Sequence, residues 1–155
     1  MSKNKRKFIT FGAPKIDKEE INGVKKVMQS GWLGTGPEVA KFEKHFMNYK
    51  KAKNAAAVSS ATAALHLSLL SCNLNAKDEV ITTAMTFCST VNAIIHSGAK
   101  PILVDIDYQT GNIDIEAIKK AITKNTKAII PVHYAGRPCN MREIVEIAKD
   151  NNLFI

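Results

Sequence analysis

The sequence changes its pattern at residue 54, and this change constrains the fold more than any other feature. From there to residue 155, short apolar runs of strand length alternate with segments that have helical spacing. We expect strands at residues 55–58, 79–83, 101–106 and 127–132 and from 153 onward, with helices at 60–72, 87–97, 114–122 and 141–149. Because such strands usually join by right-handed crossovers, the pattern predicts an α/β fold with a mostly parallel sheet flanked by helices. Ligands of such sheets bind beyond the carboxyl ends of the strands.

Residues 1–53 differ in composition, and we predict that they form a basic N-terminal arm and two helices, separate from the α/β part at 54–155. The whole net charge of +8 lies in this first part, because the remainder balances to zero. Aromatic residues are not interleaved with the basic ones, so a solvated tail and charged helix faces explain the charge better than nucleic-acid binding. We therefore expect no nucleic-acid partner.

Capping residues mark the two helices of this first part. Asp17 and Glu20 form a capping-box pattern, and Gly31 would end the first helix. A glycine-rich loop at 32–37 leads to the second helix, with Pro37 in its first turn. Each helix carries an apolar stripe that we interpret as a core face: Ile21, Val24 and Met28 in the first, and Val39, Phe42, Phe46 and Tyr49 in the second.

The start of the predicted helix at 60–72 is suited to binding a phosphate. Ser59 or Ser60 would cap this helix, and small residues at 61–63 fill its first turn. Small side chains leave the free backbone N–H groups of a helix start accessible, and these groups bind anions. An ordinary capped helix would have the same local sequence, so this segment alone does not distinguish the two.

Six short blocks, taken together, carry a family resemblance. They occur in one order: GWLGTGP at 31–37, SSATAALHL at 59–67, DEVIT at 78–82, Thr86-Phe87, GAKP at 98–101 and IPVHYAG at 130–136. From about Phe11 to Ile155 the chain resembles the amino-terminal part of sugar aminotransferases of the DegT/DnrJ/EryC1/StrS family, which use pyridoxal phosphate (PLP). Ala61 replaces a glycine that many members have. With the PVHYAG block, it most resembles the branch that aminates a UDP-linked 4-keto-pentose for lipid A modification.

The resemblance implies the large domain of fold-type I PLP-dependent transferases, incomplete at the C-terminus, in a homodimer with the 32–37 loop near the subunit junction. The backbone amides of Ala61, Thr62 and Ala63, with the Thr62 hydroxyl, would bind the PLP phosphate. Phe87 would lie against the pyridine ring, although the residue pattern alone fits a core aromatic equally well. The acidic partner of the pyridine nitrogen and the Schiff-base lysine would follow residue 155. No catalytic residue is therefore assigned, and residues 1–155 alone are expected to be inactive.

The implied reaction moves an amino group from glutamate, which becomes 2-oxoglutarate, to a nucleotide-linked keto sugar in cell-surface polysaccharide or lipid A sugar biosynthesis. Two alternatives remain: a PLP- or PMP-dependent sugar dehydratase of the same superfamily, in which histidine replaces the lysine, and a catalytically inert truncated module. His133 and Arg137 receive no role, because a lone histidine after a strand is more often packed or hydrogen-bonded. A Rossmann dehydrogenase is disfavoured, since no Gly-x-Gly-x-x-Gly follows a strand.

Composition argues against several other classes. The three cysteines and four histidines show no metal-ligand spacing, so we expect buried free thiols, packed or solvated imidazoles and no metal. No apolar run reaches the ~20 residues that cross a membrane, and no apolar segment follows the basic N-terminus as in a secretory signal. These features predict a cytoplasmic protein without a membrane partner.

Overall fold

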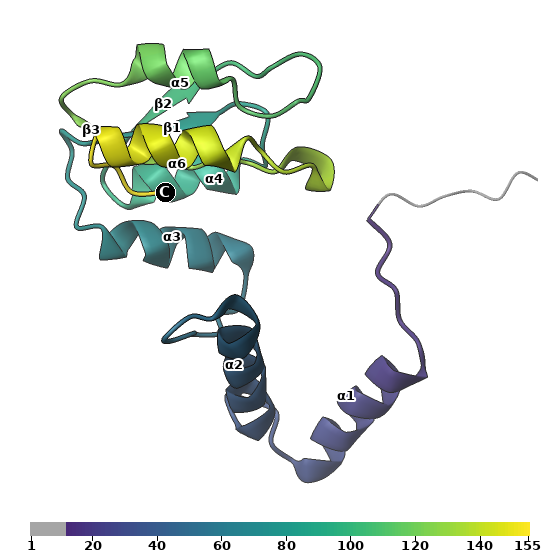
Figure 1. Cartoon of the computed structure of the whole chain (residues 1–155). Coiled ribbons are helices and arrows are strands. Elements are labelled where there is room, and N and C mark those ends of the chain that lie inside the picture. Colours follow the sequence, from purple (N-terminus) through teal and green to yellow (C-terminus); the bar gives the residue numbers. More distant parts are fainter. Residues whose placement is uncertain (1–11) are drawn as a thin grey trace, which may run out of the picture. The chain divides into compact units, whose positions relative to one another are not determined.

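The computed structural model describes residues 12–155, which divide into two compact units after Ala57 (Figure 1). The first unit contains α1 (Lys18–Ser30) and α2 (Pro37–Lys50). The second, from Val58 to Ile155, contains the sheet and all the remaining helices of the described residues. In residues 12–155, no helix combines the length and the apolar character that crossing a membrane requires.

The centre of the second unit is a parallel sheet, which confirms the predicted fold class. Its three strands, β1 (Glu79–Thr83), β2 (Lys100–Val104) and β3 (Thr126–Ile129), lie in the order β2-β1-β3. Glu79 pairs with Lys100 on one side and Thr126 on the other, so all three strands begin at one edge. Phe154 forms a further parallel bridge to Ala128, as expected for a strand beginning near residue 153.

Helices cover both faces of this sheet. Successive strand residues point to opposite faces: Ile81 and Ile129 pack with buried residues of α5 (Ile115–Ala121) and α6 (Met141–Asp150). Val80 and Ala128 pack instead with Leu69 of α3 (Ala61–Ser71) and Ile94 of α4 (Ser89–His96). The sheet therefore separates two apolar cores. A short 3₁₀ turn, η1 (Tyr134–Gly136), precedes α6.

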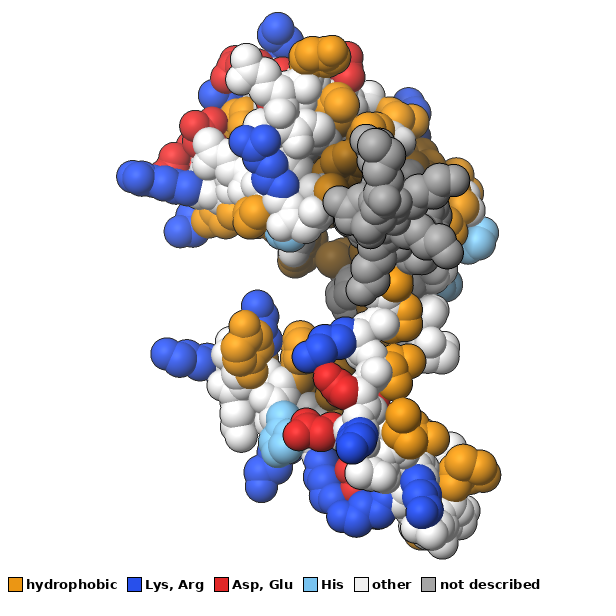
Figure 2. All heavy atoms as spheres, turned by 90° about the vertical axis from the view of Figure 1, so that its right-hand side faces the viewer, with side chains coloured by type: hydrophobic (Ala, Val, Ile, Leu, Met, Phe, Trp, Pro, Cys, Tyr) orange, Lys and Arg blue, Asp and Glu red, His pale blue; other side chains and the backbone are white. Residues whose placement is uncertain are grey.

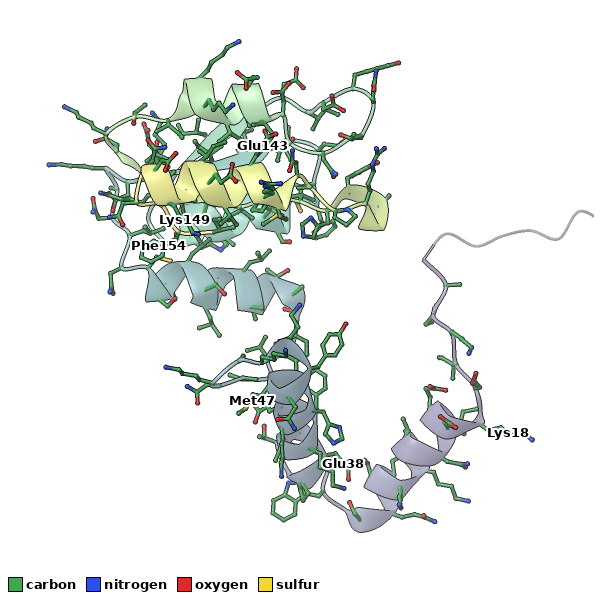
Figure 3. All side chains as sticks on the ribbon, viewed as in Figure 1. Lys18, Glu38, Met47, Glu143, Lys149 and Phe154 are labelled. Carbon is green, nitrogen blue, oxygen red and sulfur yellow. The ribbon has the colours of Figure 1, made fainter. Side chains whose placement is uncertain are left out.

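Local sequence explains where the helices begin. Asp114 caps α5, its Oδ1 accepting a hydrogen bond from the Ala117 N–H at 2.9 Å, as predicted. α6 buries Ile144, Ile147 and Ala148 and leaves charged residues exposed; Figure 3 labels two of them, Glu143 and Lys149. This two-sided pattern is the usual one for a helix between a core and water.

In the first unit, the predicted helix ends are confirmed. Gly31 ends α1 in the left-handed conformation, its N–H bonding the Met28 carbonyl at 3.2 Å, and α2 begins at Pro37. Between them the Trp32 ring lies against Gly36, where a Cβ would fall 2.1 Å from the ring, and Trp32 Nε1 donates to the Thr35 carbonyl at 2.9 Å. The loop is therefore closed by its own tryptophan.

The interpretation of the two apolar stripes as core faces is wrong for this unit. No residue of α1 or α2 is buried. The large apolar side chains are exposed instead: Ile21, Val24 and Met28 on α1, and Phe42, Phe46 and Tyr49 on α2. In Figure 2 hydrophobic and basic side chains alternate over the lower part of the view, which holds these helices. The spacing predicted amphipathic helices correctly, but periodicity does not tell what covers an apolar face.

Two strand predictions also need correction. Residues 55–58 form no strand, since no neighbouring strand of residues 12–155 pairs with them; the Ala57 N–H donates instead to Glu43 Oε1 at 2.8 Å. The strand expected at 101–106 is β2, which ends at Val104 instead; it lies at a sheet edge, and Leu103 remains 51% exposed although its apolar run suggests a buried strand. An apolar run does not distinguish an edge strand from a central one.

Candidate functional site

The first element of the candidate site is the start of α3. Ser60 is the capping residue, and its Oγ accepts a hydrogen bond from the Ala63 N–H at 3.1 Å. No acidic residue lies in the first turn, and Ala61 and Thr62 are exposed. A helix start without nearby negative charge has a positive partial charge at its free amides, so it attracts anions.

The amides of this turn differ in availability. Within residues 12–155, no group accepts a hydrogen bond from the Ala61 or Thr62 N–H, so both remain open to a ligand. The Ala63 N–H is already engaged by Ser60, and Ala63 is half-buried. A phosphate at this turn would therefore bind mainly Ala61 and Thr62 and would share the Ala63 N–H with Ser60 Oγ.

The second element is the turn that carries Phe87, between the carboxyl end of β1 and α4. Phe87 is 76% exposed, so its interpretation as a core aromatic is wrong. The turn itself is held by threonines. Thr83 Oγ1 accepts from the Met85 N–H at 3.1 Å, the Thr86 and Thr90 hydroxyls lie 2.8 Å apart, and the Thr90 N–H donates to the Phe87 carbonyl at 3.0 Å. An exposed phenyl ring on a fixed turn is available to contact a flat ligand.

Both elements lie on the same side of the second unit. In Figure 1, α3 begins on the side toward which the strands run, and the turn after β1 lies on that side as well. This edge is the one where parallel sheets bind their ligands. The phosphate-binding prediction and Phe87 therefore fall on one edge of one unit.

A third element at this edge is the connection that follows β3, residues 130–140. His133 Nδ1 accepts a hydrogen bond from the Cys139 N–H at 3.1 Å, in line with the hydrogen-bonded histidine expected there. Arg137 Nη1 lies 3.4 Å from the Gln109 carbonyl oxygen, at the long end of hydrogen-bond range. Ala135 adopts the left-handed conformation, with φ 50° and ψ 29°, which is uncommon outside glycine.

Asn112 is the residue of this edge that the sequence did not reveal. It is buried, and its side chain bonds three backbone groups of residues 134–138. Sequence pattern assigns only the neighbouring Asp114, as a helix cap. The only signal is a polar residue between Gly111 and Ile113, and that signal is equally typical of a turn.

Two titratable groups near this connection have shifted pKa values. Hydrogen bonds from Thr110 are the main cause that lowers the pKa of Asp107, and the charge of Arg137 adds to it. Burial raises the pKa of the Cys139 thiol, whose Sγ lies 3.1 Å from the Val132 carbonyl oxygen. Cys139 is therefore a packed thiol whose burial favours the protonated form.

The other cysteines and histidines form no reactive cluster. Cys88 is exposed, so the prediction of buried thiols is wrong for this residue, whereas Cys72 is half-buried and Cys139 buried. The His66 and His96 rings pack edge-on with centroids 6.1 Å apart. Within residues 12–155, no group of three or more His, Cys, Asp or Glu side chains is placed to hold a metal ion.

Comparison with known proteins defines the family and the fold of this chain. The DegT/DnrJ/EryC1/StrS aminotransferase family matches residues 14–155, and the chain belongs to this family. Over 148 residues it is 52% identical to protein MJ1066 of Methanocaldococcus jannaschii, covering 96% of this chain and 38% of that protein. Over 155 residues it is 45% identical to the spore coat polysaccharide biosynthesis protein SpsC of Bacillus subtilis, covering 100% of this chain and 40% of SpsC.

Solved structures give the same result. The PLP-form of the putative sugar aminotransferase Spr1654 from Streptococcus pneumoniae superposes with a TM-score of 0.84 and 36% identity, covering 95% of this chain and 38% of that one. The chain thus spans about two fifths of the length of the relatives that it matches.

Proposed function

We propose that this chain supplies the cofactor-binding edge of a PLP-dependent sugar aminotransferase, with residues 54–155 as the amino-terminal part of the PLP-binding domain. The amino group would pass from glutamate to a nucleotide-linked keto sugar for a cell-surface polysaccharide or lipid A, in the cytoplasm. The observation that carries the proposal is the open helix start at Ala61 and Thr62 together with the exposed ring of Phe87 at one sheet edge. The names of SpsC and of Spr1654 support the sugar and the cofactor.

The residues present fit the cofactor in charge and in shape. Two free N–H groups on a turn of small side chains match the needs of a phosphate, and the first turn holds no carboxylate to repel it. Thr62 is the second residue of α3, and its hydroxyl would add a third donor to the N–H groups of Ala61 and Thr62. Phe87 offers a ring face for the pyridine ring, since stacked aromatic pairs gain energy beyond their buried area.

When bound, PLP supplies the electron sink on which amino transfer depends. This chain's own residues would bind and orient it. Ala61 and Thr62 would fix the phosphate, and Phe87 would fix the plane of the ring and exclude water from one face. The proposal assigns no lysine of residues 1–155 to the Schiff base, so this chain alone is expected to bind PLP weakly and to transfer no amino group.

The outward face of α3 supports a homodimer. Leu67 and Leu70 are 54% and 46% exposed, and α3 has no Asp, Glu, Lys or Arg that would form a charged outer face. A helix of this kind is normally buried in an interior. A second copy of the protein is the partner that we propose for this face.

Binding of PLP to the 155-residue chain tests the cofactor proposal, with inorganic phosphate as competitor. Thr62→Val should weaken both PLP and phosphate by roughly ten- to a hundredfold, because one charge-assisted hydrogen bond contributes about 1.5–3 kcal/mol. Phe87→Ala should weaken PLP by roughly five- to tenfold and leave phosphate unchanged, because a stacked pair contributes about 1 kcal/mol.

The control variants for Phe87→Ala and Thr62→Val lie at the other edge of the sheet, where the strands begin. Phe154→Ala removes a phenyl ring beyond α6 that is also exposed, at 55%, and Ser71→Ala removes a hydroxyl from the last turn of α3. Neither should change PLP binding. The cofactor proposal fails if PLP does not bind to the unaltered chain, or if Phe87→Ala and Phe154→Ala behave alike. Amino transfer from glutamate by the unaltered chain would contradict the assignment of the lysine outside residues 1–155.

A further inference from the structure

Two connections that are distant in sequence meet at the carboxyl edge of the sheet. The first follows β2 and comprises residues 105–114, and the second follows β3 and comprises residues 130–140. β2 and β3 lie on opposite sides of β1 and do not pair with each other. Strand pairing alone therefore does not fix one connection against the other, and another contact must do so.

The Asn112 side chain makes that contact with every polar hydrogen it has. Its Nδ2 donates to the carbonyl oxygens of Arg137 at 3.1 Å and Pro138 at 3.0 Å. Its Oδ1 accepts from the Tyr134 N–H at 3.0 Å. An asparagine amide offers two N–H donors and one carbonyl oxygen, and all are used here. Because Asn112 is 5% exposed, water has little access to replace these bonds.

The backbone segment that carries the Asn112 side chain is itself held in place by hydrogen bonds. Residues 105–114 form a small hairpin, in which the Asp107 N–H bonds the Asn112 carbonyl at 2.8 Å and the Asp114 N–H bonds the Asp105 carbonyl at 3.1 Å. Asp107 Oδ1 accepts from the Thr110 N–H at 2.8 Å and closes the turn. The backbone of Asn112 is therefore held independently of the residues that its side chain binds.

The 130–140 connection contains a strained residue, so contacts with another segment are needed to hold its backbone. Ala135 holds a left-handed backbone that strains a residue with a Cβ. The three groups bound by Asn112, at residues 134, 137 and 138, lie on both sides of Ala135. Packing adds to this clamp, because Gly111, at φ 72°, lies so close to the Tyr134 ring that a Cβ would fall 3.0 Å from it.

From these contacts we propose that Asn112 is a positioning residue, which joins the 105–114 hairpin to the 130–140 connection and so sets His133, Tyr134 and Arg137 at the edge of the cofactor site. This inference rests on the proposed function only in taking that edge as the site. His133 is held through the same clamp: its Nδ1 is occupied by the Cys139 N–H, which leaves Nε2 as the nitrogen open to a ligand.

Asn112→Asp is the variant that tests this role, because it keeps the shape and places a carboxylate oxygen against two carbonyl oxygens. Amide hydrogen exchange of residues 130–140, mapped by mass spectrometry, should accelerate on the order of tenfold or more. The alkylation rate of the buried Cys139 should rise with it, while the exposed Cys88 reacts as before. Asn151→Asp is the control for the same substitution at an exposed asparagine, since Asn151 Nδ2 also donates to a backbone carbonyl, that of Ile147 at 2.8 Å, but next to the opposite sheet edge.

A second measurement needs no variant. In the unaltered chain, exchange at increasing denaturant should give one opening free energy for residues 105–114 and 130–140. Separate openings, or equal changes in Asn112→Asp and Asn151→Asp, would overturn the proposal. So would acceleration spread evenly over the strands, because that result indicates a general loss of stability.

PLP binding separates this inference from the proposed function. Asn112→Asp should bind PLP as the unaltered chain does, since Asn112 touches neither Ala61 and Thr62 nor Phe87. If the unaltered chain binds no PLP, the proposed function is contradicted, whereas the exchange and alkylation rates still decide whether Asn112 joins the two connections. If Asn112→Asp loses PLP binding together with its strand protection, the residue is structural and the positioning role is wrong.

Discussion

The two faces of the sheet in the second unit differ in how they meet water. On the α5–α6 face, buried isoleucines of both helices pack on the sheet, and α6 presents charged residues to solvent, including the Arg142–Glu146 pair. On the α3–α4 face, a smaller core of six buried residues lies beneath helices whose outer sides carry no Asp, Glu, Lys or Arg and expose Leu67, Leu70 and Ile95. The α5–α6 face thus presents charged side chains to water, whereas the α3–α4 face presents large apolar side chains that are usually buried.

The exposed residues show where the second face is incomplete. Leu67 and Leu70 of α3, Ile95 of α4 and Leu103 of β2 are 46% to 54% exposed. Parallel sheets usually have both faces covered, and exposed apolar patches usually mark an interface. We therefore expect the apolar residues of the first face to stabilise the single chain, and those of the second face to promote association.

The largest expected effect distinguishes the two faces by stability. Ile144→Ala removes a fully buried side chain from the α5–α6 core and should lower the free energy of unfolding by about 2–5 kcal/mol. Leu67→Ala, on the exposed side of α3, should change it by no more than about 0.5 kcal/mol. Urea titration of dilute protein measures both, and similar losses in the two variants would show that α3 is covered within one chain.

Self-association should depend on the α3–α4 face more than on the α5–α6 face, the reverse of the order expected for stability. The unaltered chain should self-associate through α3, and replacing Leu67 and Leu70 by Glu should weaken this association by about 2–3 kcal/mol, because full burial of one leucine contributes about 1.5–3 kcal/mol and each of these two is already about half buried. Sedimentation velocity over a range of concentrations measures the effect. The control replaces Glu143 and Glu146 of α6 by Ala, which should leave association unchanged. A stable, monodisperse monomer of the unaltered chain would contradict the incomplete-face interpretation.

Helix caps give a smaller comparison between the faces. Ser60 and Asp114 each accept one hydrogen bond at the start of a helix, α3 on one face and α5 on the other. Ser60→Ala and Asp114→Ala should each cost about 1 kcal/mol of unfolding free energy. A much smaller loss for Ser60→Ala, measured by the same titration, would indicate that the α3 start is held by contacts other than its cap.

The smallest effect concerns pH. Burial raises the pKa of Cys139, in the α5–α6 core, so the unfolded chain releases this proton more easily than the folded one. The contribution is present below the unfolded pKa of about 8.5 and is lost as the pH rises through the folded value. Between pH 8 and 10 the unaltered chain should therefore lose more stability than Cys139→Ala does.

The sequence predicts those features that depend on neighbouring residues. The Asp114 cap, the Gly31 helix end and the alternation of strands with helices all follow from local chemistry, and the structure confirms them. Ala61, Thr62 and Phe87 could be singled out because a family resemblance supplied their role, and that role remains a proposal. Exposure could not be predicted from periodicity, because Phe42 and Leu103 have the pattern of buried residues but no partner within residues 12–155 covers them.

Asn112 lies beyond such reasoning for a different reason. Its partners are 22 to 26 residues away, so no local pattern contains them. Only the parallel arrangement of β1, β2 and β3 brings the two connections to one edge. A sequence can predict that edge, but the pairing of one amide with three backbone groups depends on the detailed path of both connections.

The close approach of Gly111 to the Tyr134 ring has a consequence for evolution. A side chain at position 111 would meet both the left-handed backbone and the ring, so the position can change only when the ring becomes smaller or moves. The two positions should therefore covary among homologues: sequences with a residue other than glycine at 111 should have a small side chain at 134. Homologues that pair a large residue at 111 with an aromatic at 134 should differ in the backbone of this connection.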